Sequence, residues 1–400
     1  MNVAGLTRNV GVLLICQMIG ALGSIVIVTL GGIVGGQLAS NPALSTLPIS
    51  IMVIGVALTT VPAALLMARI GRRRGFVMSA LIGAGGVLLM ATALSQRNFA
   101  LLCAGTGCYG VHMAFVQQYR FAAAESVVPA LTSRAISLVL LGSIGGALLG
   151  PVLVGYGRDA VGETPYVGTM LMLAALLIVA SVCASLVRDA RDAPGEHRTF
   201  EARPLSEIAR QRGYWIAVLC AGVGYGVMTF VMTATPLSMH VHDGYSIEQT
   251  AGVVRTHVIA MYAPSLFSGF LMERFGVRRV MLVGTGLLLL TICVGFAGRD
   301  LMHYRVALVA LGVGWNFLYV GGTTLLTRSY SPTEKFKSQA LNDLCIFAMS
   351  ATASLLSGTV MGLFGWNAVM TAALPPLVFV LVALTILRKS ESSDAARASI

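Results

Sequence analysis

Charged residues are scarce in this sequence. Only 11% of the 400 residues are Asp, Glu, Lys or Arg, whereas 56% are hydrophobic and the mean hydropathy is +0.83. Soluble domains carry about 25% charged residues. This deficit excludes an ordinary soluble globular domain and assigns the chain to a lipid bilayer.

Several functional patterns are also missing. No nucleophile stands beside a general base and no glycine loop for phosphate is present, which argues against an enzyme, and no prosthetic group is expected. The polar stretch 188–212 and the tail after Lys389 are too small for a receptor or scaffold domain. The seven cysteines all lie in apolar segments, so no disulfide framework is indicated.

Long apolar stretches recur along the whole chain. Each has about 20 residues or more, enough to cross a hydrocarbon core of about 30 Å. We therefore predict an all-α integral membrane protein with twelve transmembrane helices. The predicted spans are 9–35, 47–69, 75–95, 98–122, 133–157, 164–187, 213–239, 247–272, 278–297, 303–326, 338–362 and 366–387.

The net charge of +11 is explained by the positions of the basic residues. Most of them lie in alternate connections, for example Arg74, Arg203 and Lys335, whereas the opposite connections hold few, such as Arg158 and Arg305. The positive-inside rule then predicts that both termini and the central linker are cytoplasmic. A nucleic-acid partner has no other support. The N-terminus shows no small-residue cleavage site, so we expect it to form a retained first helix.

An internal repeat divides the chain. Residues 64–74 align with 269–279 at an offset of 205 (269 minus 64), and the same offset aligns 133–137 with 338–342. One register for two distant segments indicates duplication into two six-helix halves, an arrangement typical of secondary transporters. We expect a bundle at 1–187, a cytoplasmic linker at 188–212, a second bundle at 213–390 and a cytoplasmic tail at 391–400.

Two pairs of metal donors occur at helical spacing. Met228-x-x-x-Met232 and His257-x-x-x-Met261 lie in adjacent spans, and residues four apart share one helix face. Counted from the connection between these spans, the depths of Met232 and His257 agree within about 5 Å. Thioether sulfur with neutral imidazole favours Cu(I), whereas Ca²⁺ and Mg²⁺ prefer oxygen and structural zinc usually takes thiolates. The four side chains are therefore our candidate copper site.

A packing interpretation competes with this one. The chain has 19 Met, so one pair at this spacing can arise by chance, and Met on apolar helices usually packs. His257 shifts the balance, because an ionisable group at membrane depth is costly and marks a functional candidate. The alternative for His257 is a ring held by a neighbouring backbone or Ser group.

Further polar groups are weaker candidates. Met239, His240 and His242 at the outer end of span seven are candidates for metal capture, although histidines at an interface are commonly just solvated. Another set is polar within the spans or, for Glu125, close to the loop at a cytoplasmic end, and it suits proton coupling or a structural ion pair. Its members are Arg120, Glu125 and Asp343.

Two loops resemble the Gly-x-x-x-Asp-Arg-x-Gly-Arg-Arg signature of the major facilitator superfamily. The residues that carry the resemblance are Arg69, Gly71 and Arg73 in the first half and Glu273, Arg274, Gly276 and Arg278 in the second. In that family the acidic residue and the arginines lock cytoplasmic loops to helix ends. Ala68 stands where the family has Asp, so the resemblance implies a carboxylate gate only at Glu273.

Within the superfamily, the two donor pairs resemble those of the CcoA-type copper importers of bacterial inner membranes. This resemblance implies uptake of copper across the inner membrane by alternating access, to supply assembly of cbb3-type oxidases. The implied partners are the copper ion, its donors and acceptors and the bilayer, and we expect a monomer.

A different substrate class fits the same composition. The alternative is a proton-coupled exporter of small hydrophobic organic compounds, for which Met-rich walls would also serve. Changing Met232 or Met261 to Leu separates the two functions, because a drug pocket would tolerate it and a copper site would not.

Overall fold

The computed structural model describes residues 3–40, 44, 47–162, 164–188 and 203–398, and within these ranges it contains helices and no strand. The chain divides into two compact units: Met1–Val128 with Leu138–Thr199, and Pro129–Ser137 with Phe200–Ile400. Most of the predicted linker, residues 189–202, lies outside the described residues, as do residues 399–400 of the predicted tail.

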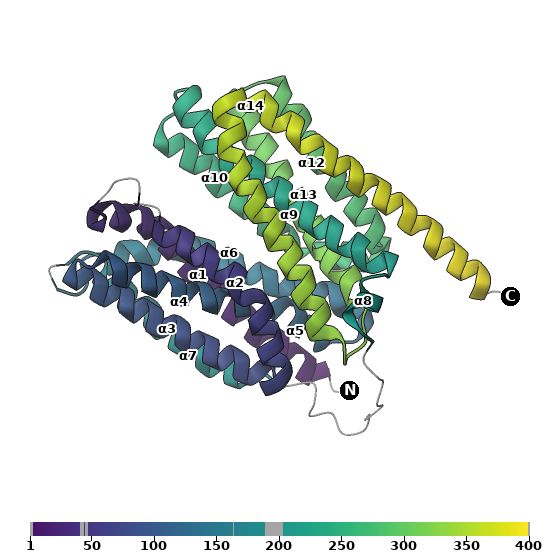
Figure 1. The fold of residues 1–400 in the computed structure, drawn as a ribbon, viewed down its shortest axis with the longest axis horizontal. Coiled ribbons are helices and arrows are strands. Elements are labelled where there is room, and N and C mark those ends of the chain that lie inside the picture. The colour runs from purple at the N-terminus through teal and green to yellow at the C-terminus, as the bar shows by residue number, and fades with distance from the viewer. Residues whose placement is uncertain (1–2, 41–43, 45–46, 163, 189–202, 399–400) are drawn as a thin grey trace. The chain divides into compact units, whose positions relative to one another are not determined.

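The first unit is a helical bundle. It contains α1 (Val3–Leu38), α2 (Leu47–Ile70), α3 (Arg72–Gln96), α4 (Phe99–Val116), α5 (Tyr119–Glu125), most of α6 (Thr132–Gly157) and α7 (Val167–Ser185) (Figure 1). α3 packs against α4 and α7, and α2 packs against α4. The core between them includes Val87, Tyr109 and Leu173, all fully buried.

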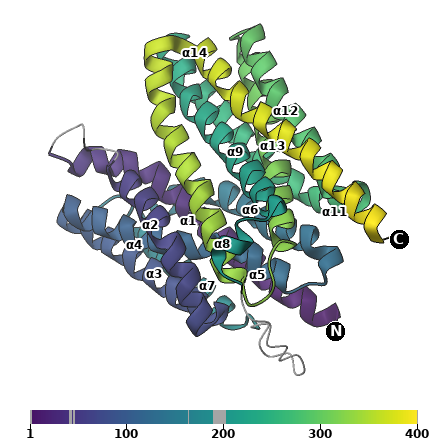
Figure 2. The ribbon, with the colours of Figure 1, turned by 45° about the vertical axis from the view of Figure 1, so that its right-hand side comes forward.

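The second unit is also a bundle. It contains α8 (Leu205–Ile208), α9 (Arg212–Pro236), the π-helix η4 (Leu237–His242), α10 (Ile247–Tyr262), the 3₁₀ turn η5 (Ala263–Leu266), α11 (Ser268–Phe275), α12 (Val277–Ala297), α13 (Leu301–Thr327) and α14 (Lys335–Ala398). The 3₁₀ turn η2 (Pro129–Leu131) and the start of α6 belong to it. α13 packs against α9, α10 and α12, and α14 packs against α9 (Figure 2).

The predicted spans correspond to these helices, with three differences, of which the first is that span four is divided into α4 and α5. Within the described ranges, ten helices are long and apolar enough to cross a membrane. Spans eleven and twelve fall in α14, where Gly365 breaks the helix with a φ of 76°. Span eight is divided into α10, η5 and α11, because Pro264 in the 3₁₀ turn cannot donate to the helical ladder. The predicted all-α membrane class is confirmed.

The repeat is visible in the backbone of two loops. Gly71 precedes α3 with φ 88° and ψ 160°, and Gly276 precedes α12 with φ 88° and ψ 142°. These conformations are nearly restricted to glycine. Their sequence separation equals the offset of the repeat, so both halves use the same backbone turn.

Candidate functional site

His257 is held in a defined position on α10. The helix begins with a capping box, in which Ser246 Oγ accepts from the Gln249 N–H at 3.1 Å and the Ser246 N–H donates to Gln249 Oε1 at 3.0 Å. His257 follows about three turns later. Its side chain is fully buried, and its Nδ1 lies 2.7 Å from the backbone oxygen of Leu308 in α13.

The two ring nitrogens of His257 have different roles. A carbonyl oxygen can only accept, so Nδ1 carries the proton and Nε2 of the neutral ring keeps its lone pair. Nε2 is buried, with no hydrogen-bond partner among the residues that the structure describes. Metal-ligating histidines commonly show this arrangement, because the bond at one nitrogen fixes the tautomer and orients the other nitrogen.

Met261 lies one turn beyond His257 and is buried. Asn316 of α13 fixes the backbone at this point by donating from Nδ2 to the Met261 oxygen and to Ser265 Oγ, each at 2.8 Å. Gly312 permits the close approach, because a Cβ there would meet the backbone of residues 257–261. One surface of α13 therefore supports the His257-Met261 pair.

The second donor pair lies on α9. Met228 is buried and Met232 is half-buried. One turn before Met228, Gly224 lies against Leu318 of α13. α9 and α10 have few direct contacts, and both pack on α13. The depth argument did not foresee that both helices pack on α13, and the common level and the meeting of all four donors remain predictions.

No group of three His, Cys, Asp or Glu side chains suited to a metal ion occurs in the described part of the chain. A metal site built around His257 would therefore depend on thioether sulfur. That ligand set suits a soft ion such as Cu(I) and is unsuited to Ca²⁺ or Mg²⁺.

The predicted capture residues at the end of span seven lie in η4. Met239 is fully buried, whereas His240 and His242 are exposed. The Nδ1 of His240 lies 2.7 Å from the Tyr245 backbone oxygen, to which it donates. The two histidines are thus available to water, while the Met239 side chain belongs to the core.

In the first unit the two predicted gating arginines lie at the surface. Arg69 and Arg73 are exposed. Arg72, which follows Gly71 in the same motif, is buried and pairs with Glu125 at 2.6 Å. The first unit therefore has an ion pair at this loop despite Ala68, and its carboxylate comes from a residue 53 positions beyond Arg72. Only a three-dimensional contact reveals this partner.

In the second unit, Glu273 of the motif pairs with Arg134 at 2.7 Å. Partial burial raises the pKa of the Glu273 carboxyl in spite of the neighbouring guanidinium, which acts to lower it. Arg274 is exposed and Arg278 half-buried. The ion pair fastens the start of α6 to the end of α11.

The three candidates for coupling are buried or half-buried groups. Arg120 is buried, with its guanidinium 4.4 Å from the Phe121 ring centre. The Glu125 carboxylate forms an ion pair with Arg72. Asp343 of α14 is buried and accepts from Asn342 Nδ2 at 2.9 Å. These are the contacts of a structural ion pair and a hydrogen-bonded carboxylate, and a role in coupling remains a prediction.

Sequence reasoning missed an aromatic cluster. Trp315 and Tyr319 of α13 stack at 5.1 Å and 15°, and Tyr225 of α9 meets both edge-on at 5.6 and 5.5 Å. Tyr262 and Phe347 extend the cluster through edge contacts. Trp315 Nε1 is buried and makes no hydrogen bond to any described residue. The i, i+4 spacing of Trp315 and Tyr319 was a usable signal.

A buried carboxylate that the sequence did not indicate holds the end of the linker. Glu334 is 2% exposed and accepts two side-chain hydrogen bonds from Arg203, at 2.7 and 2.8 Å. The N–H groups of Arg203 and Ser331 donate to it as well. The bonds from Arg203, with help from Ser331, lower the pKa of Glu334 to about 2.

The sequence profile of the Major Facilitator Superfamily matches residues 13–263 and 244–399. The chain is 37% identical over 394 residues to the riboflavin transporter RfnT of Brucella anthropi, and the match covers 98% of each protein. It is 29% identical over 371 residues to YdeG of Bacillus subtilis, an uncharacterized transporter of the same type, covering 88% of this chain and 85% of the relative.

Solved structures share the fold at low identity. The FucP transporter in its outward conformation matches with a TM-score of 0.72 and 15% identity, over 95% of this chain and 98% of FucP. A bacterial homologue of the iron transporter ferroportin matches with a TM-score of 0.70 and 14% identity, over 96% and 99%. The fold of two six-helix halves is thereby confirmed.

Proposed function

We propose that this chain, which belongs to the Major Facilitator Superfamily, imports copper as Cu(I) across a bacterial inner membrane. As a multi-pass transporter of this superfamily, it would move its substrate by alternating access of its two halves. Both termini would be cytoplasmic, and the imported copper would serve assembly of cbb3-type oxidases. The observation that carries the proposal is the Nε2 of His257, which is buried and has no described partner.

A buried polar atom without a partner destabilises a protein by about 1–3 kcal/mol. That cost has a functional explanation if Nε2 binds a metal ion during the transport cycle. The carbonyl of Leu308 supports this role, because it fixes the proton on Nδ1. A purely structural His257 would leave Nε2 unexplained.

The methionines supply the rest of the proposed site. Met261 and Met228 are buried, and Met232 is half-buried. Thioethers are neutral and bind Cu(I) without losing a proton, so the site need not bury a negative charge. Such ligands suit transport because the ion must also leave. Protonation of Nε2 would remove the lone pair and assist release.

A second candidate is transport of a planar organic solute. It is favoured by the RfnT relative, whose name gives riboflavin as substrate, and by the cluster of Trp315, Tyr319 and Tyr225. These rings would offer flat surfaces to an aromatic solute once they become accessible in the transport cycle, and the buried Nε1 of Trp315 would then offer a hydrogen-bond donor. Fold alone does not decide the substrate, because one fold supports many functions.

Uptake of both substrates should be measured in the same cells. Cells that lack their own copper and riboflavin importers would express this chain, and initial uptake of each substrate would be compared at matched expression. We expect copper uptake, with Met261→Leu slowing it about tenfold or more because a ligand is lost. Met370→Leu is the matched control, since Met370 is fully buried in α14 but packs on Gly295, outside the site.

The outcomes are distinct. If copper uptake survives both Met261→Leu and His257→Gln, the proposed copper site is ruled out. Riboflavin uptake without copper uptake, lost in Trp315→Leu and retained in Met261→Leu, would establish the second candidate instead.

A further inference from the structure

Three consecutive arginines at the start of α3 have different surroundings. Arg72 is 5% exposed and pairs with Glu125 at 2.6 Å, whereas Arg73 and Arg74 are exposed. Successive helical residues are rotated by about 100°, so one guanidinium enters the core while its neighbours lie outside it. Arg73 and Arg74 line a groove of about 930 Å³.

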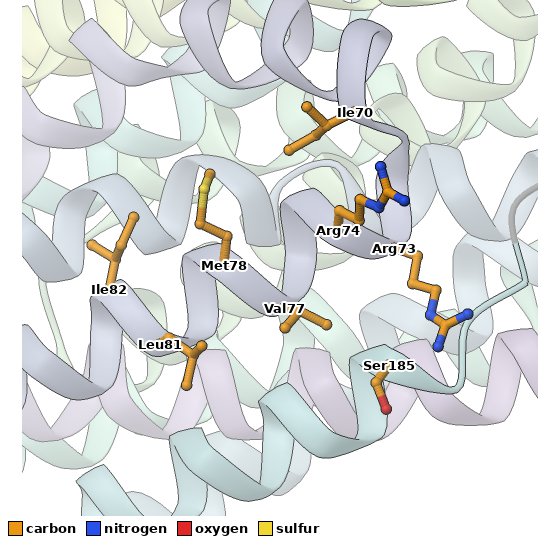
Figure 3. Close-up of a pocket in the computed structure, with 8 residues that line it drawn as sticks. All are labelled: Ile70, Arg73, Arg74, Val77, Met78, Leu81, Ile82 and Ser185. Carbon is orange, nitrogen blue, oxygen red and sulfur yellow. The ribbon is translucent and has the colours of Figure 1, made fainter.

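The groove continues along α3 as an apolar row. Val77 and Leu81 follow Arg73 at steps of four residues, and Met78 and Ile82 follow Arg74 in the same way. Each set therefore lies on one face of the helix. Figure 3 shows the two guanidinium groups at one end of the groove and Leu81 and Ile82 at the other.

The dimensions of the row suit one membrane leaflet. From Arg74 to Ile82 the helix rises about 12 Å, which is close to half of a hydrocarbon core of about 30 Å. The apolar surface continues on α7, which packs against α3 and whose Ser185 lines the groove. Val182 and Ile178 of α7 are 61% and 49% exposed. An elongated apolar molecule with a negative head would match both the apolar row and the two guanidinium groups at its end.

We propose that this groove binds an anionic phospholipid, with its phosphate at Arg73 and Arg74 and an acyl chain along Val77 and Leu81. Charge complementarity selects the headgroup, because guanidinium groups recognise phosphate oxygens through charge-assisted hydrogen bonds. The apolar row selects a lipid over a free anion, which would leave that surface uncovered. The groove shares no residue with the candidate copper site, since all of its residues belong to the first unit.

Native mass spectrometry of the full chain tests the proposal. Protein released from nanodiscs of equal parts phosphatidylglycerol and phosphatidylcholine should retain phosphatidylglycerol preferentially. Arg73→Gln with Arg74→Gln should lower that preference by roughly fivefold for each charge removed. Val77→Trp, which leaves both arginines in place but fills the groove, should lower total lipid retention.

The control is Arg158→Gln with Arg305→Gln, which removes two exposed charges elsewhere. If the preference for phosphatidylglycerol falls as much in this control as in the Arg73 and Arg74 variant, a general charge effect explains it and the proposal is overturned. Unchanged preference in the Arg73 and Arg74 variant would overturn it as well. So would loss of bound phosphatidylglycerol on addition of millimolar inorganic phosphate, because the groove would then be a site for free anions.

Discussion

At the scale of single residues, the chain places charge and lone pairs where membrane helices can least accommodate them. His257 was identified from sequence because an ionisable group at membrane depth demands an explanation. The alternative of a ring held by a neighbouring backbone group is met at Nδ1 by the Leu308 oxygen. That Leu308 would supply this oxygen could not be predicted, since a backbone carbonyl has no sequence signature. The same holds for the pairs Arg72 with Glu125 and Arg203 with Glu334, whose partners are distant in sequence.

The Glu334 carboxylate makes a pH-dependent contribution to stability. Its pKa falls from the ordinary 4.5 to about 2 in the folded chain because Arg203 binds the charged form. The stabilisation is therefore present above about pH 4.5 and is lost as the pH falls towards 2. Glu334→Gln should unfold at a lower temperature than the parent protein at pH 7, by the equivalent of about 1–3 kcal/mol.

Thermal unfolding in detergent at pH 7, 4 and 3 checks this prediction. The difference between Glu334→Gln and the parent should narrow as the pH falls. A difference that stays constant over this range would show that the carboxylate charge is not the source of the stabilisation.

At the scale of helices, much of the architecture followed from hydrophobic length, and the exceptions have local causes. Span eight is divided because Pro264 lies inside an apolar run that otherwise reads as continuous. The placement of α13 against both α9 and α10 depends on close approaches at Gly312 and Gly224. Periodicity cannot determine which of several apolar helices will be neighbours, so the helix that supports the donors could not be predicted, and their common level remains a prediction.

The glycine turn before α3 is a second feature of this scale. Gly71 has φ 88° and ψ 160°, a conformation that other residues adopt at a cost of about 1–3 kcal/mol. Gly71→Ala should therefore lower the stability by that amount. Gly85→Ala within α3 should raise it by up to about 1 kcal/mol, because Ala favours a helix and a Cβ there meets no atom within 4 Å.

Thermal unfolding of the two variants provides the comparison, since each adds a single methyl group at or near the same helix. Equal effects of the same sign would contradict the conformational argument.

At the scale of the whole molecule, the asymmetric distribution of arginine sets the orientation that we propose. Thr333 lies in the connection between α13 and α14 on the side rich in basic residues, and Asp300 precedes α13 on the opposite side. Both residues are exposed. A membrane-impermeant maleimide should therefore label Thr333→Cys only in inside-out vesicles and Asp300→Cys only in right-side-out vesicles.

Labelling of the parent chain, whose seven cysteines lie in apolar segments, measures the background that must be subtracted. Labelling in the reverse pattern would invert the orientation and, with it, the assignment of both termini to the cytoplasm.

The central claim is that His257 and the methionine pairs bind one Cu(I) ion. The most direct measurement is copper K-edge X-ray absorption of the purified chain loaded with Cu(I). We predict one copper per chain, with sulfur scatterers and a single nitrogen that disappears in His257→Leu but remains in Met370→Leu. A chain that retains no Cu(I), or a copper environment that is the same with and without His257, would contradict the account.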